Sequence, residues 1–187
     1  TGGSLLLTVL SLVPGVMAGS RPEIRVLELM PGLDLALKVE PLGMLFAVIA
    51  SALWIVTSVY SIGYMRGHQE ENQTRFFAFF AVAIAATMGA AFAGNVLTLS
   101  LFYEILPLST YPLVTHHRTL EAMRGGRIYL GILMGTSIGF LLLAVVWTWS
   151  LTGTLEFAAG GIFAGIRESG RVTDTTIGVL LGLYVFG

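Results

Sequence analysis

Long apolar stretches separated by short polar blocks organise this sequence. Stretches at 42–64, 76–114 and 127–151 contain almost no charge, and shorter ones occupy 5–18 and 177–187. A helix that crosses the hydrocarbon core of a bilayer needs about 20 apolar residues. The stretches are continuous, whereas barrel strands would alternate over about 10 residues, so the pattern favours helices.

The stretch at 76–114 is too long for one crossing. Its roughly 39 residues would form a helix of about 58 Å, nearly twice the thickness of about 30 Å that must be crossed. We therefore expect two spans, 76–93 and 96–114, joined by a turn at Gly94-Asn95. The expected fold is an all-α, polytopic transmembrane helix bundle that forms a single region over 1–187, with partial spans at 5–18 and 177–187.

Composition supports the same class. Charged residues make up 11% of the chain and hydrophobic residues 55%, whereas about 25% of a soluble domain is charged. This excludes an ordinary soluble enzyme domain and a disordered tail. The net charge of −1 excludes a nucleic-acid binder, and the absence of Cys excludes disulfides and thiolate metal sites. The lipid bilayer is the expected surrounding.

Polar segments connect the spans. Residues 24–39 mix apolar and charged positions around Pro31-Gly32, which predicts a short hairpin or an interfacial loop. The chain starts without Met and stops inside an apolar stretch, so we expect a piece truncated at both ends. A signal peptide over 5–18 is the alternative to a partial span there, but it lacks the usual basic residues.

Basic residues set the expected orientation. The loops at 65–75 and 115–126 together hold as many Lys and Arg residues as the loops on the opposite side, although the opposite loops are about twice as long. The basic residues of 65–75 and 115–126 also lie close to the ends of spans. They are Arg66, Arg75, Arg118, Arg124 and the bordering Arg127. The positive-inside rule therefore places both loops in the cytoplasm. We expect the cell membrane of a bacterium or an archaeon.

Glu104 is the one ionisable carboxylate inside a predicted span. It lies about 12–15 Å from either end of its helix, near the bilayer centre. A charge at that depth costs at least about 2.5–3.5 kcal/mol, so such residues usually carry function. We interpret Glu104 as an intramembrane proton carrier. The alternative is a permanently protonated side chain that only hydrogen-bonds to a neighbouring helix.

Other residues on the same helix suggest a path for protons. Pro107 and Pro112 each remove a backbone N–H, which frees carbonyls at membrane depth and predicts a bend. Ser100, Tyr111 and Thr115 share the face of Glu104, where they could hold a file of water or could simply bond neighbouring helices.

Histidines and glycines offer two further candidates. His116 and His117 follow the helix and could form a proton mouth, or could be interfacial residues at a helix C-terminus. They predict no metal site, because adjacent histidines on a helix diverge. Gly131, Gly135 and Gly139 repeat every four residues, which predicts a face for close helix packing.

The sequence of residues 99–114, LSLFYEILPLSTYPLV, resembles a segment of the proton-conducting antiporter-like subunits. These subunits belong to respiratory complex I, membrane-bound hydrogenases and Mrp-type cation/proton antiporters. Thr115-His116-His117 and the glycine-rich span that follows look most like the branch of the Mrp D subunit and the hydrogenase complexes, whereas Pro107 departs from the complex I pattern.

The resemblance implies the first part of the antiporter-like fold, with Glu104 as the intramembrane glutamate. That residue would pair with a lysine beyond Gly187. It further implies a subunit without a cofactor or catalytic centre of its own, which translocates protons, with Na⁺ as a candidate second ion. Its partners would be other membrane subunits. The alternatives are a non-pumping membrane scaffold of a redox complex and, with least support, an oxidoreductase acting on quinone.

Overall fold

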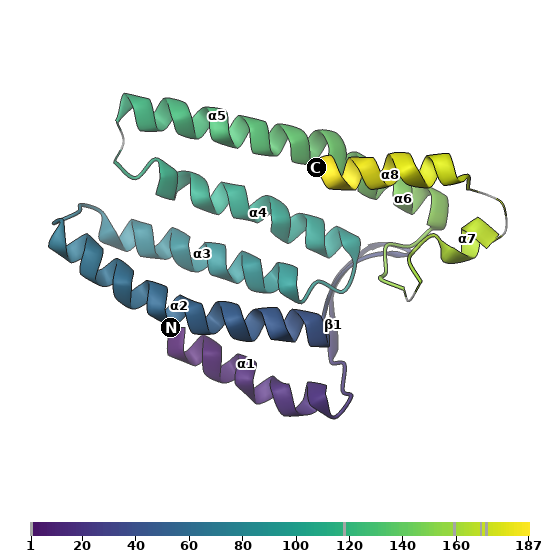
Figure 1. Ribbon diagram of the computed structural model, residues 1–187, viewed down its shortest axis with the longest axis horizontal. Coiled ribbons are helices and arrows are strands. Elements are labelled where there is room, and N and C mark those ends of the chain that lie inside the picture. The colour runs from purple at the N-terminus through teal and green to yellow at the C-terminus, as the bar shows by residue number, and fades with distance from the viewer. Residues whose placement is uncertain (1, 118, 159, 169, 171) are drawn as a thin grey trace.

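The computed structural model describes residues 2–117, 119–158, 160–168, 170 and 172–187 (Figure 1). The predicted cytoplasmic residue Arg118 lies outside the described residues. Eight helices, one π-helical segment and two strands form the described chain. They are α1 (Gly2–Met17), β1 (Glu23–Met30), β2 (Leu33–Lys38), α2 (Pro41–Gly67), α3 (Gln73–Ala91), α4 (Val96–Val114), α5 (Leu120–Thr136), η1 (Ser137–Leu142), α6 (Leu143–Thr152), α7 (Ala164–Glu168) and α8 (Asp174–Phe186).

Four helical stretches are long and apolar enough to cross a membrane, which agrees with the predicted membrane fold. They are α2, α3, α4 and the continuous stretch α5–η1–α6. The last begins at Leu120, several residues before the predicted start at 127, because the Thr119 side chain accepts a hydrogen bond from the Ala122 N–H and caps the helix. α1 and α8 are shorter apolar helices, where partial spans were expected.

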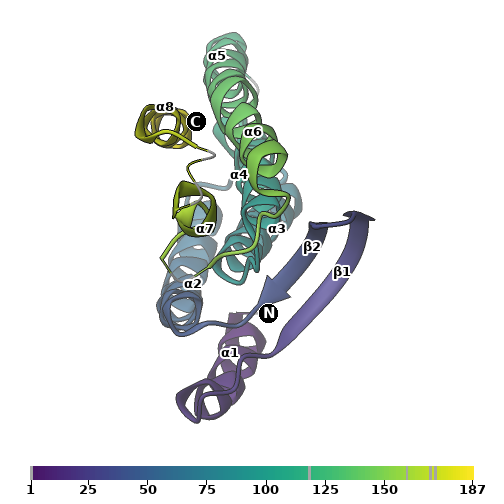
Figure 2. The same ribbon diagram turned by 90° about the vertical axis from the view of Figure 1, so that its right-hand side faces the viewer.

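The helices α1 to α5 lie side by side in a row, and each packs against the next along the chain (Figures 1 and 2). α3 and α4 approach closely at Gly89. The ring of Phe102 on α4 occupies the space that a Cβ atom would need at this position, so only glycine fits there. α8 packs across η1 and α6, where its Leu180 is fully buried and the Tyr184 hydroxyl lies 2.9 Å from Thr148 Oγ1.

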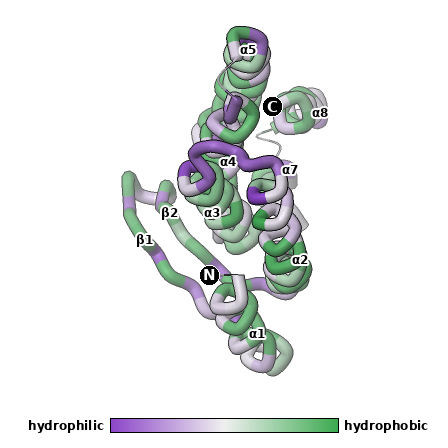
Figure 3. The backbone as a smooth tube through the Cα atoms, turned by 90° about the vertical axis from the view of Figure 1, so that its left-hand side faces the viewer, coloured by the Kyte–Doolittle hydropathy of each residue, from purple (hydrophilic) through white to green (hydrophobic). Residues whose placement is uncertain are grey.

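Apolar side chains cover the outside of the row, and polar segments gather at its ends. Leu42, Val59 and Val185 are examples of large apolar side chains that are more than two-thirds exposed. Figure 3 shows hydrophobic helices and hydrophilic connections at the end where α2 meets α3. Lipid chains suit such an exterior, since a bilayer imposes no cost on exposed apolar surface.

The polar segment after α1 forms a β-hairpin, one of the two forms predicted for it. β1 and β2 pair antiparallel, with Glu23 opposite Lys38 and Met30 opposite Leu33. Gly32 turns the chain with a φ of 77°, a left-handed conformation that favours glycine. A Cβ at this position would also overlap the carbonyl of Gly153, so the hairpin tip lies directly against the loop after α6.

Asn95 joins this hairpin to the turn between α3 and α4. Its side chain is 1% exposed, its Oδ1 accepts from the Thr98 N–H at 2.8 Å, and its Nδ2 donates to the Asp34 carbonyl at 2.7 Å. The Thr98 hydroxyl in turn accepts from the Ala36 N–H at 3.0 Å. The predicted Gly94-Asn95 turn is therefore correct, and Asn95 both caps α4 and binds the hairpin.

Replacing Asn95 with Ala is expected to lower the free energy of unfolding by about 2–3 kcal/mol, because buried polar groups of Thr98 and Asp34 lose their partners. Denaturant titration of the purified intact protein in detergent measures this. Asn72→Gly is the matched control, since Asn72 is exposed, makes no capping bond and has a φ of 55° that glycine tolerates. Equal stability of both variants would contradict the role of Asn95.

Candidate functional site

Helix α4 carries Glu104 close to its midpoint. Glu104 lies eight residues after Val96 and ten before Val114, which places it about 12 Å or more from either end. The helix runs unbroken through Pro107 and Pro112. A bend at Pro107 therefore stays a prediction, whereas the depth of Glu104 within the helix follows directly from the observed bounds.

The carboxyl group of Glu104 lies between α4 and the neighbouring helical stretch. Ser137, the first residue of η1, donates its hydroxyl hydrogen to Glu104 Oε1. The other oxygen, Oε2, is buried and has no hydrogen-bond partner among the described residues. One oxygen is thus held by a neighbouring helix, and the second remains free to bind a proton or a water molecule.

Ser137 lies at the start of a change in helix type. From Ser137 to Leu142 the helix widens to the π form, and the Ser137 side chain is only 2% exposed. Single π turns within α-helices occur frequently at functional sites. The sequence analysis did not select Ser137, because an isolated serine in an apolar span is common and its neighbour on another helix cannot be read from spacing.

The predicted hydroxyl path is only partly assembled. Ser100 donates to the Val96 carbonyl and Thr115 to the Tyr111 carbonyl, so both hydroxyls bond their own helix. No hydrogen bond between Ser100 and Glu104 is present among the described residues. Tyr111 and Thr115 do share a cavity of about 470 Å³, which Arg75, Phe79, Pro112 and Met123 complete.

His116 and His117 differ in their surroundings. The side chain of His116 is 9% exposed, and its ring lies edge-on to Phe76, whereas that of His117 is 65% exposed. Both face Glu70, whose Oε2 lies 4.0 Å from His116 Nε2 and 3.6 Å from His117 Nδ1. Glu70, which sequence reasoning missed, thus joins the α2–α3 loop to the end of α4.

The glycine stripe at 131, 135 and 139 has no partner within the described chain. A Cβ atom at any of the three would meet nothing within 4 Å. Packing against a partner subunit, or against a part of the protein outside this sequence, therefore stays a prediction. Gly126 on the same helical stretch differs, because a Cβ there would overlap the Thr115 side chain.

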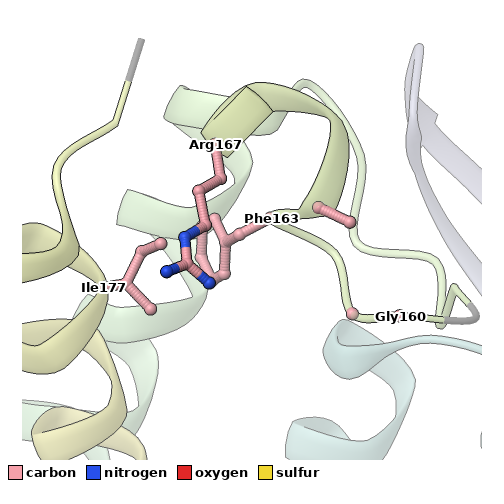
Figure 4. A pocket seen from close by; sticks show the side chains of 6 residues that line it. Gly160, Phe163, Arg167 and Ile177 are labelled. Carbon is pink, nitrogen blue, oxygen red and sulfur yellow. The ribbon is translucent and has the colours of Figure 1, made fainter. Parts of the chain in front are cut away.

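A separate cavity of about 580 Å³ lies between α7 and the start of α8 (Figure 4). In Figure 4 the guanidinium group of Arg167 lies beside the ring of Phe163, and Ile177 faces both from α8. Arg167 Nε also pairs with Asp174 at 3.0 Å. None of the residues that the sequence analysis singled out lines this cavity. Within the described chain, no group of three or more His, Asp or Glu side chains could hold a metal ion.

Two family models match this chain. The first, described as NADH-ubiquinone oxidoreductase (complex I), chain 5 N-terminus, covers residues 31–77. The second, described as NADH:quinone oxidoreductase/Mrp antiporter, TM, covers residues 93–185. Between them they include β2, α2 and the whole stretch from α4 nearly to the end of α8, and therefore both Glu104 and Ser137.

Named relatives agree with these models. NADH-quinone oxidoreductase subunit L of Mycobacterium tuberculosis is 27% identical over 150 residues, which are 79% of this chain and 23% of the relative. Na(+)/H(+) antiporter subunit A1 of Staphylococcus aureus is 27% identical over 148 residues, 75% of this chain and 18% of the relative. The chain thus spans less than a quarter of these relatives. The closer likeness to the D-subunit branch stays a prediction.

Solved structures share the fold. A chain of the membrane-bound sulfane sulfur reductase, an archaeal respiratory membrane complex, superposes with a TM-score of 0.78 at 20% identity over 99% of this chain and 36% of its own. A chain of the Mrp complex from Dietzia sp. DQ12-45-1b gives 0.61 at 19% identity, over 99% and 33%. At these identities the likeness establishes the architecture.

Replacing Gly135 with Leu tests the glycine stripe. We expect the variant to fold, because the position is open within this chain, but to lose incorporation into its membrane complex, because a Leu side chain prevents close helix approach. Native gel electrophoresis of solubilised membranes measures incorporation. Gly63→Leu, at another open glycine on α2, is the control. Full assembly of the Gly135 variant would show that the stripe has no partner helix.

Proposed function

Because this chain belongs to the family of membrane subunits shared by NADH:quinone oxidoreductases and Mrp antiporters, we propose that it is part of a proton-translocating subunit. The observation that carries the proposal is the Glu104 carboxyl group, held at mid-helix by Ser137 and with one oxygen unpartnered. A carboxyl group in this setting can bind and release a proton without needing any cofactor.

The proposed subunit works inside a larger membrane complex. It has no catalytic centre of its own and couples proton movement to a partner, either a redox arm or a module that moves Na⁺. The names of the Na(+)/H(+) antiporter relatives support the sodium alternative, and those of the NADH-quinone oxidoreductase relatives support the redox one. The unpartnered glycine stripe supports contact with a further membrane helix.

The proposed orientation puts the loops at 65–75 and 115–126 in the cytoplasm. Both loops lie at the same end of the row of helices, the end opposite the hairpin (Figure 1). The described basic residues there include Arg66 and Arg75, beside the ends of α2 and α3. Such residues near span ends on one side support a cytoplasmic location in a bacterial or archaeal cell membrane.

A non-pumping scaffold is the second candidate function. The open apolar exterior and the glycine stripe would serve such an anchor equally well. The two candidates differ in what they require of Glu104, because an anchor needs only its hydrogen bond to Ser137, whereas a translocating subunit needs its titration.

Replacing Glu104 with Gln separates these functions, because the amide keeps the size and hydrogen-bonding capacity of the side chain but cannot titrate. In the intact protein we expect proton pumping to fall by roughly 10²-fold, the scale of a positioned proton-transfer group. Glu104→Asp should be milder, since it keeps a carboxyl group. Pumping is measured in vesicles, and complex assembly is measured on the same preparation.

Glu28→Gln is the control, since Glu28 is exposed on β1 and lies outside the membrane-spanning helices. Wild-type pumping by the Glu104→Gln variant would favour the scaffold. If that variant fails to assemble, infrared difference spectroscopy of the carboxyl band in the wild-type protein decides. A band that changes with turnover supports the carrier, and an unchanged band supports the scaffold.

A further inference from the structure

Three residues at the cytoplasmic end form a cluster that the proposed function does not yet use. We call Glu70, His116 and His117 the inlet cluster. Together with His68, Gln69, Glu71 and Asn72 they line a cavity of about 260 Å³, and polar atoms dominate its lining. The cluster joins the loop between α2 and α3 to the loop between α4 and α5.

The backbone holds Glu70 toward the histidines. Its N–H donates to the Met65 carbonyl at 3.0 Å, and its carbonyl accepts from the Gln73 side chain at 3.1 Å. Two non-glycine residues of this loop, Gln69 and Asn72, adopt positive φ angles of 52° and 55°. Such conformations are uncommon outside glycine and shape the loop so that Glu70 is 19% exposed while Glu71 is exposed.

The two ring nitrogens of His116 have different surroundings. Its Nε2 lies 4.0 Å from Glu70 Oε2, and its Nδ1 is buried with no hydrogen-bond partner among the described residues. An imidazole ring can accept a proton on one nitrogen and release one from the other, which makes histidine a proton shuttle. The exposed His117, whose Nδ1 lies 3.6 Å from the same Glu70 oxygen, can exchange protons with solvent.

Arg75 links the cluster to a second cavity. Arg75 donates from its guanidinium group to the His116 carbonyl at 3.1 Å and also lines the 470 Å³ cavity with Tyr111 and Thr115. Its Nε is buried without a partner, like His116 Nδ1. The Arg75 Nε–H could therefore donate to a water molecule in this cavity. Tyr111 lies seven residues, about 10 Å, from Glu104 along α4.

We propose that Glu70 and His116 form the inlet at which protons are taken up from the cytoplasmic side on their way to Glu104. The inlet rests on the proposed translocation function and adds its uptake site. Glu70 collects the proton, His116 passes it across its ring, and the cavity beside Arg75, Tyr111 and Thr115 receives it. Among the described residues, the other charged and titratable groups that face the inlet are His68, Glu71, His117 and Arg75.

Replacing Glu70 with Gln in the intact protein tests the inlet. The negative charge of Glu70 beside His116 attracts protons to the cavity mouth, which matters most when the solution is alkaline and free protons are scarce. We expect the pumping rate to fall roughly tenfold near pH 8 and less than about twofold near pH 6, where free protons are abundant. Glu121→Gln, at an exposed residue in the first turn of α5 that is not among the residues lining this cavity, should leave the profile unchanged.

The His116→Ala variant supplies a second test. Pumping should fall near pH 8 and should recover when imidazole is added, because the free base can occupy the vacated space. An assembled variant that imidazole does not restore would contradict the shuttle. If this variant does not assemble, the pH profile of Glu70→Gln decides.

The outcomes separate this inference from the function on which it rests. If Glu104→Gln is inactive while Glu70→Gln keeps the wild-type pH profile, the inlet is wrong and translocation stands. If the Glu70 variant loses activity equally at every pH, the cluster has only a structural role in joining the two loops. That result also overturns the inlet. If Glu104→Gln pumps normally, translocation itself fails, and the inlet fails with it.

Discussion

The hydrocarbon interior of a bilayer offers no water to polar groups, so each buried donor and acceptor must find a partner in the protein. The helices satisfy their own backbones, which is why the apolar stretches form α2, α3 and α4 with apolar side chains facing outward. The turn between α3 and α4 cannot satisfy itself. It lies at the end of the row, where Asn95 and β2 supply its hydrogen bonds.

Some buried polar atoms do not meet this requirement for a hydrogen-bond partner, and these atoms are candidates for binding water or a ligand. Glu104 Oε2, His116 Nδ1 and Arg75 Nε are buried without hydrogen-bond partners among the described residues, and so are Asp34 Oδ2 and Trp149 Nε1. Arg75, near the start of α3, bonds the His116 carbonyl just after α4, and Glu104 lies about 12 Å or more further along α4. The Glu104 oxygen and the His116 nitrogen can bind a proton or a water molecule, whereas the Arg75 Nε–H can only donate, for example to water.

Features that depend on length and hydropathy were predictable from the sequence. The two spans within 76–114 and the turn at Gly94-Asn95 follow from the thickness of a bilayer, and the depth of Glu104 follows from counting. Which helix faces Glu104 was not predictable, because the register between helices depends on packing. For the same reason Ser137, Glu70 and the bond between Asn95 and Asp34 were missed.

The two ends of the row of helices hold different kinds of polar group. At the hairpin end the buried Asn95, Asp34 and Thr98 bond one another, and Arg25 Nε faces the remaining Asp34 oxygen at 3.5 Å. The acidic neighbours of Arg25 raise its pKa, Glu23 most of all, so that its charge is constant. At the opposite end the Glu70 carboxylate faces the imidazole rings of His116 and His117. The hairpin end is therefore held by hydrogen bonds and ion pairs that fix its position, whereas the opposite end brings together carboxylate and imidazole groups of the kind that proteins use to exchange protons.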